Sequence, residues 1–89
     1  MTRPELEEAS DLCRRAAEGL EGEARDRLYD QSNQLAKLAD REQGPDHGRL
    51  ARHMNALGEL ADELDGEAAE LAAEARSKVS EYRRGVEGV

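Results

Sequence analysis

Both histidines of the chain lie in segment 42–57, EQGPDHGRLARHMNAL, together with two arginines and a proline. These residue types suit the binding of an oxyanion at the start of a helix, where free backbone N–H groups and the positive end of the helix dipole attract negative charge. Gly48 would let a ligand approach the backbone. The forked guanidinium groups of Arg49 and Arg52 would each hold two oxygens. His47 would add a positive charge as the pH falls toward about 6.5.

The same segment also has a purely structural interpretation. Asp46 is suited to cap the helix that follows it, and its carboxylate would occupy the free N–H groups and repel an anion. Arg49 and His53, four residues apart, would then cover the turn. Alternatively, they would pair with Glu42 and Glu81. We favour this structural interpretation, and the oxyanion site is the alternative.

Metal binding and catalysis find little support in the spacing of the candidate residues. His47 and His53 are six residues apart, about 240° around a helix, so they cannot face the same ion. Cys13 lies in an apolar stripe, where a buried and unreactive thiol is expected. The sequence contains no HExxH, no Glu-x-x-His and no Gly-rich phosphate loop, and no Ser-His-Asp or Cys-His arrangement is apparent. We therefore expect no catalytic residue, no metal ligand and no cofactor, and predict that the protein is not an enzyme.

The composition indicates an acidic protein with a thin core. The 89 residues include 21 acidic and 13 basic side chains, which gives a formal net charge of −8, and Phe and Trp are absent. Lys37 and Lys78 are the only lysines. Such a composition resembles that of proteins from halophilic archaea, in which a Debye length of about 3 Å in molar salt screens the repulsion between the acids. An ordinary acidic helical protein is the alternative interpretation. Solvent cations are expected at the acidic surface, and nucleic acid is an unlikely partner.

The sequence predicts neither a membrane span nor a signal peptide. It has no run of apolar residues long enough to cross a bilayer, and the first ten residues, MTRPELEEAS, contain no apolar segment. The single cysteine rules out an internal disulfide. We expect a soluble protein of the cytoplasm.

Apolar residues recur at steps of three and four in four successive segments, which is the period of amphipathic helices. These stripes contain Leu6, Ala9, Cys13, Ala16 and Leu20; Ala24, Leu28, Gln31, Leu35 and Leu38; Leu50, Met54, Leu57, Ala61 and Leu64; and Ala68, Leu71, Ala75, Val79, Tyr82 and Val86. Turn residues at 19–22, 43–46 and 65–66 separate the helices. Thr2 with Pro4 and Glu5 predicts a capping-box start for the first helix.

These features predict an all-α fold, an antiparallel up-down-up-down four-helix bundle in a single domain, 1–89. Its two αα-hairpins would span residues 4–42 and 46–86. The hairpins are similar, because a shift of 44 residues lays LEGEARDRL at 20–28 on LDGEAAELA at 64–72. Duplication and a shared demand for helical packing both explain this similarity.

The bundle topology sorts the charges between its two ends. The end with the turns at 19–23 and 65–66 is strongly acidic. Its acidic residues are Glu18, Glu21, Glu23, Asp26, Glu59, Asp62, Glu63, Asp65, Glu67 and Glu70. The opposite end, with the 43–46 turn, is close to neutral, and the topology brings Arg83 and Arg84 beside that turn. The candidate ligand-binding residues are therefore His47, Arg49, Arg52, His53, Arg83 and Arg84.

The segment GPDHGRLARHMNAL, the acidic turn after it and the closing YRRGVEGV resemble a family of small all-helical haloarchaeal proteins of unknown function. The similarity extends over essentially the whole chain. It implies a halophilic origin and no particular activity.

Two functions are compatible with the sequence. The one we favour is a non-enzymatic module for protein–protein interaction or self-association, either with a protein partner or as a homodimer that would supplement the thin core. Leu12, Tyr29 and Leu60 flank the stripes and would either form a second interface or widen one core face. The alternative is a binder or sensor of a small anion or nucleotide that uses the helix start at 46–53.

The charge and the thin core together predict that salt stabilises the protein. Screening relieves repulsion at the acidic end, and salt strengthens the burial of apolar surface. Thermal melts followed by circular dichroism should show a melting temperature that rises between about 0.1 M and about 3 M KCl. An unchanged melting temperature over this range would contradict the prediction.

Overall fold

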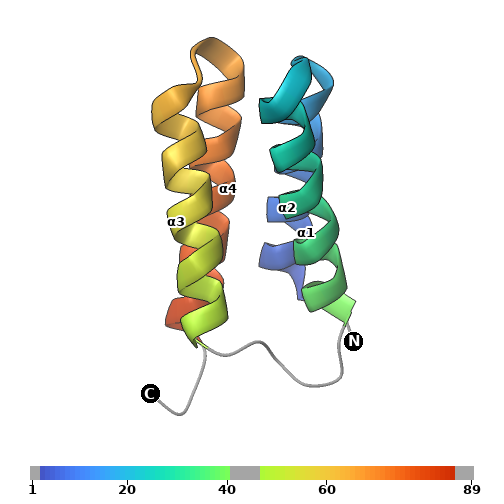
Figure 1. Cartoon of the computed structure of the whole chain (residues 1–89). Helices are drawn as coiled ribbons and strands as arrows, with labels where there is room; N and C mark the ends of the chain where they lie inside the picture. Colours follow the sequence, from blue (N-terminus) through green and yellow to red (C-terminus); the bar gives the residue numbers. More distant parts are fainter. Residues whose placement is uncertain (1–2, 41–46, 86–89) are drawn as a thin grey trace.

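The computed structural model describes residues 3–40 and 47–85, and these fold into four α-helices. The helices are α1 (Pro4–Glu18), α2 (Gly22–Asp40), α3 (His47–Glu63) and α4 (Gly66–Arg84). Figure 1 shows two antiparallel hairpins, α1 with α2 and α3 with α4, which lie side by side. The predicted all-α four-helix bundle is confirmed. The turn predicted at 43–46, with its cap Asp46, lies outside the described residues.

The start of α1 depends on Arg3 and Pro4. Pro4 occupies the first helical turn, where its missing N–H and fixed φ fit the helix, and Arg3 is the N-cap residue. The predicted cap, Thr2, lies outside the described residues. The Nε of Arg3 donates to the hydroxyl of Tyr82 (2.8 Å), and its Nη1 donates to the carbonyl of Leu38 (3.0 Å). Arg3 therefore ties α1 to the last turns of α4 and α2, where helix carbonyls lack intrahelical partners.

The turns that close the two hairpins need glycine at equivalent positions. Gly22 and Gly66 have φ angles of +73° and +63°, a region that L side chains rarely adopt. A Cβ added at either residue would meet no atom within 4 Å, so backbone conformation and not space requires glycine there. These glycines are 44 residues apart, and the same shift carries α2, at 22–40, onto the bounds of α4, at 66–84. The repeat in the sequence is therefore also a repeat in the structure.

Leucine and alanine build most of the core. The buried apolar residues are Leu6, Ala9, Leu12, Cys13, Ala16, Ala17, Leu28, Leu35, Leu38, Ala39, Leu50, Leu57, Leu60, Leu71, Ala72, Ala75 and Val79. Leu12 and Leu60 are only 7% and 1% exposed, so they widen the core, whereas a second interface would need them exposed. Tyr29 is half-buried against the same core. On α3, His53 is buried and Met54 is only half-buried, so the predicted stripe is wrong by one position there.

The two seams that join the hairpins differ in the size of their side chains. Helix α1 packs closely against both α2 and α4, and α3 packs closely against α4 (Figure 1). Helices α2 and α3 are not among the closely packed pairs. The 44-residue shift pairs three residues of α1 with residues of α3: Ala9 with His53, Cys13 with Leu57 and Ala16 with Leu60. It pairs two residues of α4 with residues of α2: Ala72 with Leu28 and Ala75 with Gln31. Because small side chains let helix axes approach, the α1–α4 seam is tight and the α2–α3 seam is wider.

Substitution of Leu57 tests the assignment of the core. Leu57 is fully buried on α3, so Leu57→Ala should lower the free energy of unfolding by about 2–5 kcal/mol through lost burial and a cavity. Glu74 is exposed on α4, so Glu74→Ala should change it by less than about 0.5 kcal/mol. Thermal and urea denaturation measure both values. Equal melting of the two variants would show that Leu57 does not belong to the core.

Candidate functional site

The six residues proposed from the sequence lie where α3 begins and α4 ends, and two of them line a common depression. The six are His47, Arg49, Arg52, His53, Arg83 and Arg84. Arg49 and Arg52 are exposed near the start of α3, and Arg84 is exposed at the end of α4. Arg83 is half-buried, and its Nε has no hydrogen-bond partner within the described part of the chain. The side chain of His47 lies outside the described residues.

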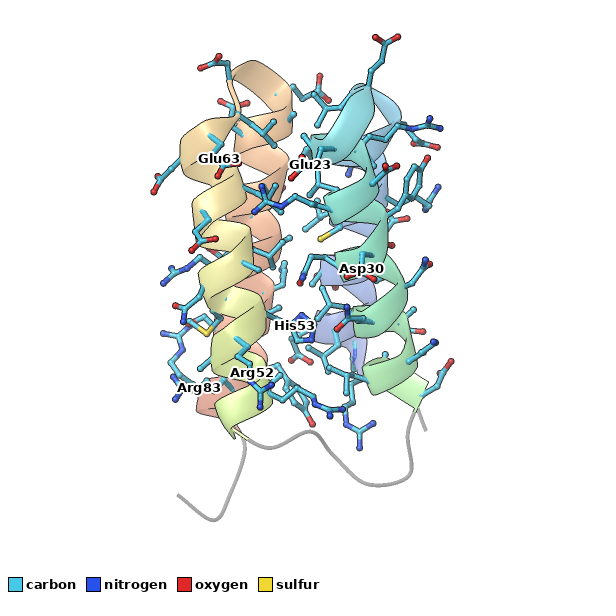
Figure 2. The ribbon with its side chains drawn as sticks, in the orientation of Figure 1. Glu23, Asp30, Arg52, His53, Glu63 and Arg83 are labelled. Atoms are coloured by element: carbon cyan, nitrogen blue, oxygen red, sulfur yellow. The ribbon has the colours of Figure 1, made fainter. Side chains whose placement is uncertain are left out.

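His53 links α3 to α2. Its side chain is 5% exposed, and it lies in the space between these helices (Figure 2). The Nδ1 of His53 is 2.6 Å from Oε1 of Gln31 on α2. Because an amide oxygen only accepts hydrogen bonds, Nδ1 carries the proton and donates it, and in the neutral ring Nε2 bears the lone pair. His53 therefore pairs with Gln31 and not with the predicted Glu81, and Glu42 lies outside the described residues.

His53 is uncharged at neutral pH. Burial lowers its pKa below the ordinary value of 6.5, the positive charges of Arg49 and Arg52 lower the pKa further, and Asp30 acts in the opposite direction. A neutral histidine with a hydrogen-bonded partner is a structural link between two helices. It becomes attractive to an anion only when it gains a proton.

A depression of about 110 Å³ lies beside His53 on the α2–α3 seam. The residues that line it are Gln34, Lys37, Leu38, Arg49 and His53. Gln34 and Lys37 were not predicted from the sequence, because they are far from segment 46–53 along the chain and no local motif marks them. The packing of α2 beside α3 brings them to Arg49. The depression combines two cationic side chains with a neutral histidine, a set that suits an oxyanion.

A larger groove lies between α1 and α4 at the acidic end of the bundle. It encloses about 320 Å³, and its lining residues are Arg15, Ala16, Gly19, Leu20, Asp65, Glu67, Ala68 and Leu71. Figure 2 shows Glu23 and Glu63 at this end of the bundle, opposite Arg52 and Arg83. The groove therefore combines apolar side chains with a strongly acidic surrounding.

The cysteine of the chain lies in the core and not at the surface. Cys13 is fully buried, and burial raises the pKa of its thiol to about 12, so the thiol stays protonated and unreactive. Within residues 3–40 and 47–85, no group of three or more His, Cys, Asp or Glu side chains is placed to hold a metal ion. In the same part of the chain, no helix has both the length and the apolar character that crossing a membrane requires.

The fold and these side chains define an all-helical bundle in which one tight apolar seam and one wider, partly polar seam join two similar hairpins. By its sequence, the chain belongs to a family of unknown function, DUF7553, whose family model matches residues 1–85. No curated protein matches the chain, and no solved structure matches it. The family assignment carries no activity, so the function is argued from the groove between α1 and α4 and from the depression beside His53.

The neutral state of His53 should make part of the stability depend on pH. Because folding lowers the pKa of His53, the unfolded chain binds this proton more readily than the folded chain. The contribution of His53 to the stability of the folded protein is fully present above the ordinary histidine pKa of about 6.5. It is lost as the pH falls through the lowered pKa of His53. The melting temperature of the wild type should therefore fall more steeply between about pH 7 and pH 5 than that of His53→Gln.

The comparison with His53→Gln isolates one histidine. His47 and the carboxylates titrate in both proteins, so their contributions cancel in the difference between the two pH profiles. Parallel profiles would show that protonation of His53 does not oppose folding.

Proposed function

We propose that the chain is a non-enzymatic interaction module that docks on another protein through the groove between α1 and α4. The composition of the groove carries this proposal. Its apolar side chains are Ala16, Leu20, Ala68 and Leu71, and the carboxylates of Asp65 and Glu67 lie beside them. Amphipathic helices bind to such grooves by inserting apolar side chains, while their charged side chains contact the rim.

The charge around the groove favours a basic partner. Glu18, Glu21 and Glu70 are exposed at the same end of the bundle, in addition to the two carboxylates of the lining. Arg15 is the cation of the lining, so the balance is negative. A symmetric dimer through this groove would bring two acidic ends together, and like charges at an interface oppose binding. We therefore favour a basic amphipathic segment of a different protein over a second copy of this chain.

The placement of the reactive side chains supports a role without catalysis. The thiol of Cys13 is buried and protonated, and the imidazole of His53 is neutral and hydrogen-bonded to Gln31. Both side chains hold helices together, and neither lines the groove at the acidic end. Binding is the function that the groove supports best.

The proposal also includes the cell in which the module works and the salt concentration there. The excess of 21 acidic over 13 basic residues, with only Lys37 and Lys78 as lysines, supports a haloarchaeal protein of the cytoplasm with solvent cations at its acidic end. The partner would then be recognised in concentrated salt. Apolar contacts in the groove would supply most of the affinity there, because salt screens charges but strengthens apolar burial.

A peptide titration tests the proposal. A fluorescent helical peptide with leucines on one face and arginines on the other should bind the protein saturably, and a matched peptide with glutamates in place of the arginines should not. Glu67→Lys in the groove should weaken the basic peptide about fivefold, the equivalent of about 1 kcal/mol for one charge contact. Glu74→Lys, with the same charge change on the same helix but outside the groove lining, should have little effect.

Three results would contradict docking in the groove. They are the absence of binding by the wild type, equal binding of the two peptides, and equal weakening by Glu67→Lys and Glu74→Lys. Sedimentation velocity over a range of protein concentrations separately tests for a second copy as the partner. Circular dichroism of each variant confirms that the fold is intact.

A further inference from the structure

The α2–α3 seam contains a polar pair, the buried His53 and the half-buried Gln31, where the repeat has alanine in the other seam. Under the 44-residue shift, His53 and Gln31 correspond to Ala9 and Ala75, which are both fully buried. Alanine at both positions packs helices closely and leaves no polar group to satisfy, whereas the buried His53 must keep its hydrogen bond to the half-buried Gln31. The polar pair separates α2 from α3, and the depression of about 110 Å³ lies beside it. Helical packing alone does not require this arrangement.

The charges beside the depression are inverted relative to the other copy of the repeat. Lys37 and Arg49 line the depression, and their counterparts 44 residues away are Glu81 and Glu5. The repeat therefore has two cations beside the α2–α3 depression at positions where its other copy has two acids. Lys37 and Arg49 place two positive charges at one depression in a chain of net charge −8, and an oxyanion is the class of ligand that complements them.

We propose that the depression between α2 and α3 binds a single oxyanion of the phosphate or sulfate class. The guanidinium group of Arg49 holds two oxygens in a fork, and the ammonium group of Lys37 contacts a third. The volume of about 110 Å³ lies below the roughly 300 Å³ of pockets for drug-sized ligands, so the site fits one tetrahedral anion and not a whole nucleotide. This site goes beyond the proposed docking function, because it lies on a different seam from the acidic groove.

His53 makes the affinity for the anion depend on pH. Its Nδ1 is bound to Gln31, so the lone pair of neutral imidazole is on Nε2 and offers no attraction to an anion. The charged groups that act on His53 are Arg49 and Arg52 on α3 and Asp30 on α2, whose carboxylate also accepts a hydrogen bond from Gln34. A bound oxyanion favours the charged imidazole. Anion binding and protonation of His53 therefore strengthen each other.

Sulfate titration followed by NMR tests the site. Sulfate keeps the same charge over the pH range in which histidine titrates, and replacing KCl with K₂SO₄ at constant ionic strength holds screening constant. The imidazole resonances of His53 should shift saturably with a dissociation constant of about millimolar. Binding should be tighter near pH 5.5 than near pH 7.5, and sulfate should raise the pKa of His53.

Matched variants separate a defined site from a general effect of charge or salt. Lys37→Gln and Arg49→Gln should each weaken sulfate about tenfold, as loss of one charge-assisted contact does. Arg52→Gln removes the same charge from the same helix but does not line the depression, so it should change the affinity less than twofold. The double variant Lys37→Glu/Arg49→Glu, which copies the other seam of the repeat, should abolish binding.

Two results would overturn the proposal. One is a shift of the His53 resonances that grows linearly with sulfate and never saturates, and the other is equal weakening by Arg49→Gln and Arg52→Gln. All of the substituted residues are exposed, so the variants should keep the fold, which circular dichroism verifies. Neither result bears on the groove between α1 and α4, so failure here is distinguishable from failure of the docking function.

Discussion

Small side chains where α1 meets α4 set the geometry of the whole bundle. Ala9, Cys13 and Ala16 on α1 and Ala72 and Ala75 on α4 are each at most 1% exposed. Because these side chains are short, the two helices approach closely and provide the tight contact between the hairpins. A chain without Phe or Trp has few bulky groups to fill a wider space, so close approach of helices replaces side-chain bulk in the core.

Polar contacts span the α2–α3 seam, which is held open by larger side chains. His53 meets Gln31 at 2.6 Å, and nearer the acidic end Arg27 on α2 meets Glu63 on α3 at 2.8 Å. The Arg27 pair is exposed and therefore contributes little to stability, whereas the His53 pair is largely removed from water and must stay satisfied. This difference makes the His53 contact the specific element of the seam, since it aligns α2 with α3 at one register.

The groove between α1 and α4 and the depression beside His53 follow from the same packing and differ in chemistry. The groove at the acidic end forms where the last turn of α1 and the first turns of α4 leave apolar side chains partly uncovered beside carboxylates. The depression near the other end forms where His53 and Gln31 keep α2 from α3, and cations line it. One molecule thus presents opposite charges at two separate places, which suits two different ligands, a basic protein segment and a small anion.

The sequence by itself determined the four helices, the glycines at their turns and the division of charge between the two ends. These features depend on residues close in the chain: the apolar period, the left-handed conformation of Gly22 and Gly66, and short connections that force antiparallel neighbours. Only the tertiary structure decided that His53 is buried against Gln31 and that Lys37 lies beside Arg49. The rotation and separation of neighbouring helices depend on side-chain volumes far apart in the sequence, and a shift of one position along a helix turns each side chain by about 100°. The polar Gln31 in an otherwise apolar stripe was the local sign of the buried pair, but the sequence alone did not identify its partner.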